Sequence, residues 1–177
     1  MTVEAGKRSS LAPLPLRLVL GCGLMIHGAP KLFSSSGQAM IRGLLEDLEI
    51  PAPWLMAWVV GSVEFFGGLA ILLGVFVSFA ALLNVANMVV AMVKVHLPAG
   101  FSFLNITGRT EDGLLQFGLP GYEVNLLYIA GLLALVIGGS GALSMGRYMT
   151  KTKTVIVSQA PPARPQAAEQ EVGRWRR

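Results

Sequence analysis

Charged side chains are scarce in this sequence. Lys, Arg, Asp and Glu make up 14% of its 177 residues, whereas hydrophobic residues make up 53% and the mean hydropathy is +0.61. Soluble domains carry about 25% charged residues, so this shortage indicates a membrane protein. The net charge of +4 needs no nucleic-acid partner, because the basic residues flank apolar segments and lack interleaved aromatic residues apart from Trp175.

Cysteine and histidine are nearly absent. The single cysteine, Cys22, excludes an intrachain disulfide and a two-cysteine redox centre, so a thiol oxidoreductase would need a partner's thiol. The preceding residues loosely resemble a lipoprotein cleavage box, but Arg17 interrupts the apolar stretch that such a signal needs. We therefore interpret Cys22 as a small packed residue. His27 and His96, without a tight motif, are weak indicators of metal or haem, so we predict no metal site.

Long apolar segments, in contrast, are abundant, and a membrane-spanning helix needs about 20 such residues. As one helix, Trp54 to Leu97 would be over about 60 Å long, twice the bilayer thickness, so we predict a reversal at residues 74–78. The sequence thus predicts an all-α membrane protein, a bundle of four transmembrane helices. The predicted helices are residues 11–33, 54–75, 78–97 and 122–143, within a membrane domain of residues 11–146.

Basic residues at the two ends of the chain predict its orientation. Residues 1–10 form a predicted cytoplasmic lead with two Lys/Arg, and residues 147–177 a basic, disordered cytoplasmic tail with seven. Because cytoplasmic segments carry an excess of Lys and Arg, both termini are predicted to face the cytoplasm. The loops at about 34–52 and 98–121 then face outward, and the localisation is a bacterial cytoplasmic membrane, multi-pass.

Each predicted helix carries one seam of polar or small residues. Ionisable side chains inside a membrane normally face the bundle interior and are paired. At 100° per residue, the four seams are Arg17, Gly21, Leu24, Gly28 and Lys31; Gly61, Glu64 and Gly68; Asn84, Asn87, Ala91 and Lys94; and Glu123, Leu127, Ala130, Ala134 and Gly138.

Glu64 is the most informative of these residues, because a carboxylate near the midplane is too short to reach the membrane surface. Counted from the helix ends at about 1.5 Å per residue, Arg17 and Glu64 differ in depth by only several ångströms. We therefore predict an Arg17–Glu64 pair, the alternative being that Arg17 extends to the cytoplasmic headgroups. A second cluster is predicted near the outer helix ends, open to water: His27, Lys31, Lys94, His96, Glu123 and Asn125.

Several of these side chains also fit purely structural roles. Lys31 and Lys94 also fit the role of anchors at the membrane interface. Asn84 and Asn87 are typical of hydrogen bonds between helices in a membrane.

Four stretches, in this order, resemble the DoxX family of four-helix bacterial membrane proteins: PLRLVLGCGLMIHGAPKLF, VEFFGGLAILLGVF, NMVVAMVKVHLPAGF and GYEVNLLYIAGLLAL. The resemblance covers roughly Leu14 to Met145. It implies a four-helix bundle in the cytoplasmic membrane and a name linked to quinol oxidase or thiosulfate:quinone oxidoreductase subunits. The residues that match the polar pattern of the family are Arg17, Lys31, Glu64, Lys94, His96 and Glu123.

Three functions remain open. The first is a redox-associated subunit that contacts quinone, with the redox centre on a partner protein; Glu64, Arg17 and Glu123 are its predicted catalytic residues. Its predicted ligand-binding residues are His27, Lys31, Asn87, Lys94, His96 and Asn125. The second is a non-catalytic assembly or scaffold subunit of a larger membrane complex or a homo-oligomer. The third is a small solute or proton permease. The sequence contains no recognisable motif for a resident cofactor, and quinone is the cofactor expected to bind.

Overall fold

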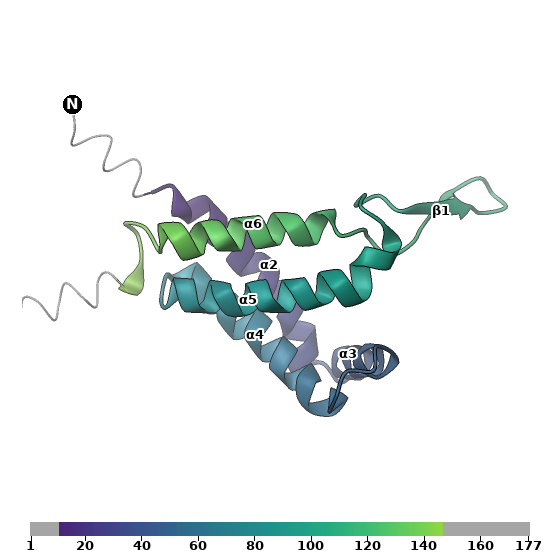
Figure 1. Cartoon of the computed structure of the whole chain (residues 1–177), viewed down its shortest axis with the longest axis horizontal. Helices are drawn as coiled ribbons and strands as arrows, with labels where there is room; N and C mark the ends of the chain where they lie inside the picture. Colours follow the sequence, from purple (N-terminus) through teal and green to yellow (C-terminus); the bar gives the residue numbers. More distant parts are fainter. Residues whose placement is uncertain (1–10, 147–177) are drawn as a thin grey trace, which may run out of the picture. The chain divides into compact units, whose positions relative to one another are not determined.

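The computed structural model describes residues 11–146, and these are mostly helical. Four helices pack against one another, α2 (Pro13–Phe33), α4 (Pro53–Leu73), α5 (Val77–Ala91) and α6 (Glu123–Gly138), as Figure 1 shows. A fifth, α3 (Ser35–Asp47), connects α2 to α4. A short hairpin of β1 (Ile106–Arg109) and β2 (Leu115–Phe117) precedes α6.

Three helices in the described part of the chain are long and apolar enough to cross a membrane. They are Pro13–Phe33, Pro53–Leu73 and Val77–Ala99, the last including two short irregular turns after α5. The fourth, α6, is apolar but shorter. Its 16 residues extend about 24 Å at ~1.5 Å per residue, somewhat less than the ~30 Å of hydrocarbon in a bilayer.

Prolines and glycines define where the spanning helices begin and end. Prolines open α2 and α4 because a first-turn residue needs no N–H donor. Gly74 ends α4 in a left-handed conformation with φ of 75°, and its N–H bonds the carbonyls of Ala70 and Ile71. Phe76, also left-handed, leads into α5. The reversal therefore lies within the residues where the sequence predicts it.

The end of α5 departs from a regular helix. Met92–His96 form a π-helical turn, in which the N–H of Leu97 bonds the carbonyl of Met92, and Leu97–Ala99 form a 3₁₀ turn. Pro98 lacks an N–H, which prevents a regular continuation. The wider turn rotates Lys94 and His96 away from the positions that an unbroken helix of residues 78–97 would give them.

The predicted interior face of the last helix is wrong. Its members after Glu123, which are Leu127, Ala130, Ala134 and Gly138, are all exposed. The buried residues of α6 are Asn125, Leu132 and Leu135 instead. Leu132 and Leu135 belong to the same apolar cluster as Val77, Ala80 and Ala81 of α5. The helix also ends at Gly138, before the predicted end at 143, since Gly139 and Gly141 take positive φ values.

The closest approach in the bundle is between α2 and α4. A Cβ on Gly21 would lie 2.9 Å from the carbonyl oxygen of Gly68, and a Cβ on Gly28 would lie 2.5 Å from the backbone nitrogen of Phe65. A Cβ on Gly61 would lie 3.0 Å from the Cβ of Lys31. The seven-residue spacing of glycines in both helices thus lets the two backbones meet along one seam, as the predicted seams indicate.

Two apolar clusters complete the packing. The larger lies among the four long helices and includes Leu24, Ile71, Ala81, Leu132 and Leu135, all fully buried. The smaller joins Ile41 and Leu45 of α3 to Ala57 of α4. The hairpin strands pair antiparallel, Ile106 with Phe117 and Arg109 with Leu115, and their residues are mostly exposed.

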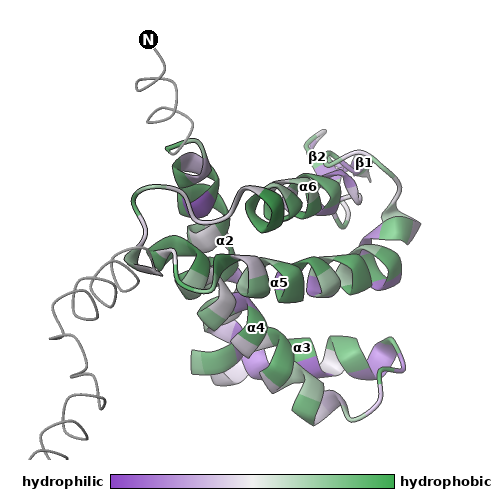
Figure 2. Cartoon of the chain, turned by 60° about the vertical axis from the view of Figure 1, so that its left-hand side comes forward, coloured by the Kyte–Doolittle hydropathy of each residue, from purple (hydrophilic) through white to green (hydrophobic). Residues whose placement is uncertain are grey.

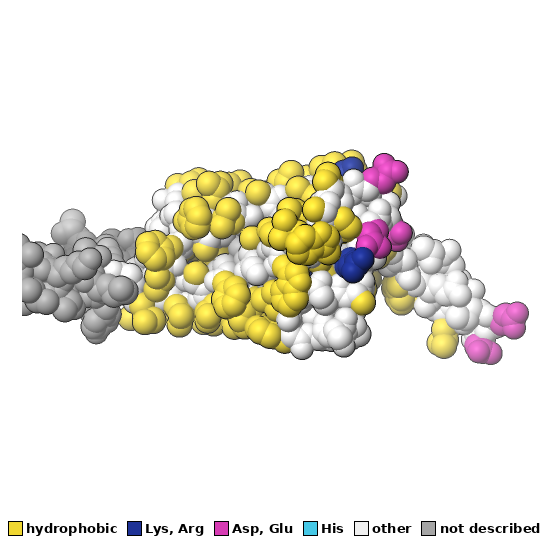
Figure 3. Space-filling view, turned by 90° about the horizontal axis from the view of Figure 1, so that it is seen from below, with side chains coloured by type: hydrophobic (Ala, Val, Ile, Leu, Met, Phe, Trp, Pro, Cys, Tyr) yellow, Lys and Arg dark blue, Asp and Glu magenta, His cyan; other side chains and the backbone are white. Residues whose placement is uncertain are grey.

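The outer surface of the long helices is apolar. Large hydrophobic side chains with more than a third of their area exposed occur along all four of them, among them Val19, Phe66, Phe79 and Ile137. Most of α5 and α6 is coloured as hydrophobic in Figure 2, and hydrophilic residues occur on α3 and in the hairpin. On one face, side chains of hydrophobic type cover most of the helical region, and Lys, Arg, Asp and Glu gather at one end (Figure 3). This is the distribution that a lipid-facing bundle requires.

Candidate functional site

Glu64 lies at the junction of three helices and is 3% exposed. Its Oε2 lies 2.5 Å from the Nζ of Lys31 on α2. Its Oε1 accepts a hydrogen bond of 3.0 Å from the Nδ2 of Asn87 on α5. Both carboxylate oxygens therefore have a partner from another helix, and the predicted placement of Glu64 in the bundle interior is confirmed.

The predicted Arg17–Glu64 pair is wrong. The glycine contacts place Gly28 of α2 beside Gly61 and Glu64, and Gly21 beside Gly68 and Leu72. By this antiparallel register Arg17, one turn before Gly21, lies opposite Gly74, and its guanidinium is indeed in contact there. Gly74 follows Glu64 by ten residues, or about 15 Å of helix. The prediction estimated the depths of Arg17 and Glu64 by counting residues from the helix ends, and this count does not include the axial offset between α2 and α4.

Arg17 instead joins two segments through their backbone carbonyls. Its Nε donates to the carbonyl of Ile71 at 2.9 Å and its Nη2 to that of Leu72 at 2.8 Å. Its Nη1 donates to the carbonyls of Ser140 at 2.8 Å and Leu143 at 2.6 Å. The first two lie in the last turn of α4, where helix carbonyls carry partial negative charge; the carbonyl of Ile71 also accepts the N–H of Gly74. The side chain is 3% exposed, and in this arrangement it stabilises the end of α4 and the segment after α6.

Lys31, which the sequence analysis placed in the outer cluster, is the cationic partner of Glu64. It lies one turn beyond Gly28 on the same face of α2, so its long side chain reaches back along the seam to Glu64. Its side chain is 17% exposed, compared with 4% for Glu64. The ammonium therefore remains closer to the surface than the carboxylate does. The sequence feature that could have predicted this pair is the position of Lys31 on the same seam of α2 as Gly28.

Other polar side chains in the interior belong to α5 and α6. The Nδ2 of Asn84 donates to the carbonyls of Val63 on α4, at 3.1 Å, and Ala80, at 3.0 Å. Its buried Oδ1 has no hydrogen-bond partner among residues 11–146. Asn125 of α6 is 6% exposed. Asn84 thus joins α5 to α4, which agrees with the interhelical role that its residue type favours.

The predicted outer cluster does not form as one group. Lys31 turns inward to Glu64, and the Nδ1 of His96 lies 2.8 Å from the carbonyl oxygen of Pro120. Glu123, in the first turn of α6, accepts the N–H of Phe103 at 3.0 Å. His27 and Lys94 are exposed. Cys22 is also exposed, so its interpretation as a packed residue is wrong; it lies on the surface of α2, away from the seam.

Residues 12–97 match the family model DoxX. The chain carries a DoxX domain. No curated protein and no solved structure matches the chain. The matched range ends at residue 97, after α5 and before the hairpin and α6, and is shorter than the range over which the sequence resembles the family. It contains Arg17, Lys31, Glu64 and Asn87, so the whole buried charge arrangement of α2, α4 and α5 belongs to the DoxX region.

The family and the apolar helices together make this DoxX protein a multi-pass membrane protein whose surface contacts lipid. Within residues 11–146, no group of three or more His, Cys, Asp and Glu side chains is placed to hold a metal ion. The site around Glu64 consists of one cation, one carboxylate and one amide, which come from α2, α4 and α5.

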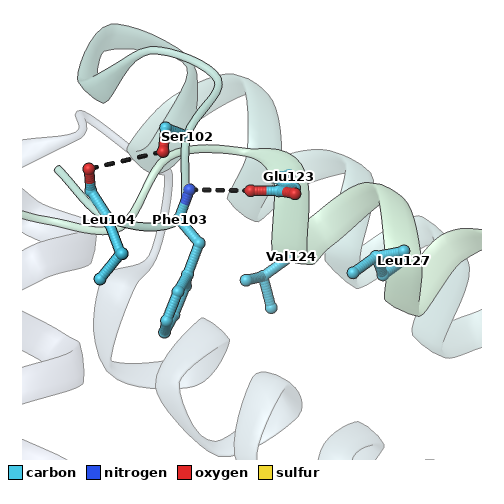
Figure 4. A pocket seen from close by; sticks show the side chains of 6 residues that line it. All are labelled: Ser102, Phe103, Leu104, Glu123, Val124 and Leu127. Carbon is cyan, nitrogen blue, oxygen red and sulfur yellow. Dashed lines mark hydrogen bonds between the residues drawn. The ribbon is translucent and has the colours of Figure 1, made fainter.

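A second feature of this DoxX protein lies at the N-terminal end of α6. An open depression of about 400 Å³ is lined by Ser102, Phe103, Leu104, Glu123, Val124 and Leu127. Figure 4 shows the carboxylate of Glu123 toward the backbone of Phe103, with the Phe103 ring and the Val124 side chain below it. The carboxylate also lies at a helix N-terminus, where its negative charge is favourable. Apolar walls beside a single carboxylate distinguish this depression from the filled interior around Glu64.

Proposed function

We propose that this DoxX protein is a structural subunit of a larger assembly in the bacterial cytoplasmic membrane. It crosses the bilayer four times, α6 included, with both termini in the cytoplasm. The excess of Lys and Arg at the two ends of the chain supports this orientation. The shorter α6 is compatible with a crossing, because a short span is accommodated by local thinning of the bilayer.

The observation that carries the structural role is the use of the buried charges. Arg17 donates all four of its hydrogen bonds to the backbone of α4 and of the segment after α6. Glu64 accepts from α2 and α5. Each charged group thus has its hydrogen-bond partners in neighbouring segments of the same chain, and these bonds stabilise the axial register of the helices. An arrangement that exchanges protons with a substrate would instead need an open side, which supports assigning these residues to the bundle.

One pair of variants tests this role. Glu64→Gln alone leaves the Lys31 ammonium without its carboxylate, whereas Lys31→Met/Glu64→Gln removes both charges and keeps an acceptor for Asn87. After mild-detergent purification, with mass spectrometry of bound proteins and a quinone turnover assay on the membranes, we expect the single variant to lose assembly. We expect the double variant to assemble and to support wild-type turnover. Retained assembly with lost turnover in the double variant would refute the structural role and identify Glu64 as a proton carrier.

A second candidate function, contact with quinone, is favoured by the depression at Glu123. Phe103, Val124 and Leu127 offer an apolar wall for a ring, and Glu123 offers a carboxylate oxygen that can accept the proton of a quinol. The electron carrier would lie on a partner protein. In this proposal Glu123 takes the part of proton acceptor, since Arg17 is not placed to hold Glu64 ionised.

Glu123→Gln is the variant that tests quinone contact, because glutamine can still accept the N–H of Phe103 but cannot take up the proton. The matched control is Glu111→Gln, the same change at an exposed residue outside the depression. With a short-chain quinol analogue titrated into protein in detergent, we expect several-fold weaker binding for Glu123→Gln, because an amide oxygen accepts the quinol hydroxyl less strongly than a carboxylate does. We expect no change for Glu111→Gln. Equal binding by wild type and both variants would exclude this depression as the contact.

A further inference from the structure

Helix α3 presents an apolar surface that the protein itself covers only in part. At 100° per residue, Met40, Leu44, Ile41 and Leu45 occupy one arc of about 140°. Ile41 and Leu45, at one side of the arc, are each 8% exposed and pack against Ala57 of α4. Met40 and Leu44, at the other side, are 70% and 37% exposed. Half of the apolar arc is therefore uncovered.

The opposite face of α3 is polar. Arg42 and Glu46, one turn apart, form an exposed ion pair in which Nε lies 2.8 Å from Oε1. A helix with one apolar and one charged face suits a boundary between apolar and aqueous phases. Ser34 alone separates α3 from the last residue of a membrane-spanning helix, so α3 lies where that boundary must be.

Aromatic residues at the neighbouring helix ends mark the same level. Phe33, the last residue of α2, is 70% exposed, and Trp54 and Trp58 in the first turns of α4 are 60% and 49% exposed. Tryptophan is enriched at membrane–water interfaces, where its apolar ring and polar N–H each find a suitable medium. Hydrophobic side chains also lie next to the charged ones at this end of the molecule in Figure 3.

We propose that α3 is an interfacial helix that lies in the headgroup–acyl boundary of the lipid bilayer, with Met40 and Leu44 in the lipid and Arg42 and Glu46 in water. Lipid is the occupant of the uncovered arc because α3 follows a spanning helix directly and packs against the first turns of α4, which carry the exposed Trp54 and Trp58. Together these residues set the depth of the spanning helices. The proposal goes beyond the structural role proposed above and does not rest on it.

Spin labels on single cysteines test the proposal directly. In a Cys22→Ser background, the full chain carries Met40→Cys, Leu44→Cys, Arg42→Cys or Glu46→Cys and is reconstituted into phosphatidylcholine–phosphatidylglycerol vesicles. Power saturation then compares the access of apolar oxygen with that of a water-soluble nickel chelate. We expect a several-fold higher oxygen-to-nickel ratio at residues 40 and 44 than at the matched control residues 42 and 46.

Each alternative result overturns the proposal. Equal nickel access at all four positions would place α3 in water. Labels at residues 40 and 44 that are shielded from both agents, with dipolar broadening, would place a second copy of the chain against α3. In a Trp175→Phe background, Trp54 and Trp58 should also be quenched more by lipids brominated near the headgroup than near the chain end. Stronger quenching near the chain end would contradict the interfacial level.

Discussion

Two buried charges in this DoxX protein are stabilised by different means. Glu64 has a cation and an amide from two other helices, whereas Arg17 has four backbone carbonyls and, within residues 11–146, no carboxylate partner. Both arrangements follow from the cost of a bare charge in an apolar medium, which amounts to several kcal/mol even after relaxation. Removing one partner therefore affects stability more than the removal of an exposed charge does.

Arg17→Gln should destabilise the bundle by about 3 kcal/mol, because it removes a buried guanidinium that donates to backbone carbonyls at the end of α4 and after α6. Arg17→Lys should cost less, yet still be destabilising, because an ammonium cannot match the planar fork that reaches both segments. Denaturant unfolding in detergent micelles, followed by circular dichroism, measures both variants. Arg42→Gln, in an exposed pair, serves as control and should change little. Equal stability of wild type and Arg17→Gln would show that these hydrogen bonds contribute nothing.

The Lys31–Glu64 pair should show strong coupling in a double-mutant cycle. Lys31→Met and Glu64→Gln should each destabilise by roughly 3–5 kcal/mol, because each leaves an uncompensated charge or an unpaired buried group. The double variant should be closer to the wild type than either single variant, since both charges are gone. The same micelle unfolding assay provides the three free energies. Additive single effects would mean that the two side chains act independently.

At the scale of elements, the glycine seam between α2 and α4 determines which residues meet. It holds the two backbones so close that a methyl group on Gly28 would overlap the backbone of Phe65. The faces of both helices could be predicted from the 3.6-residue period, and Gly21, Gly28, Gly61, Glu64 and Gly68 are all buried as predicted. The axial register of the two helices could not be predicted in this way. The helical period specifies the direction in which a residue points, but not which residues of two neighbouring helices lie at the same height along their axes.

Gly28→Ala should separate α2 from α4 and destabilise the bundle by about 1–3 kcal/mol, the usual range for overpacking. The matched control is Gly43→Ala on α3, where nothing lies within 4 Å of the added carbon. This control should raise stability by up to about 1 kcal/mol through better helix propensity. Micelle unfolding compares the two, and Lys31–Glu64 coupling should weaken in Gly28→Ala alone. A neutral Gly28→Ala would show that the seam is loosely packed.

At the scale of the whole molecule, the described ends of the bundle differ in character. One carries α3 and the hairpin, with exposed Asp112 at the hairpin turn, and the other carries the reversal at Gly74 and Phe76. The predicted orientation makes the first end extracytoplasmic. The hairpin and α3 were not predicted, because short loop segments lack the long apolar periodicity that identifies spanning helices.

Membrane-impermeant maleimide labelling measures this orientation. In a Cys22→Ser background, Asp112→Cys should react in intact cells with a permeable outer membrane, whereas Phe76→Cys should react only after the cytoplasmic membrane is opened. Both residues are exposed, so a lack of reaction is not explained by burial within the chain. The reverse pattern would show that the termini lie outside, and labelling of both residues in intact cells would refute a single orientation.

The sequence by itself determined the membrane class, the DoxX family, the reversal near Gly74 and the faces of α2 and α4 that point inward. These properties depend on composition, local periodicity and turn residues, which are readable along the chain. Only the tertiary structure decided that Glu64 pairs with Lys31, that Arg17 binds carbonyls, and that α6 buries Asn125 and Leu132. Those pairings depend on axial offset and on packing between helices, and the glycines set both through how closely the backbones can approach.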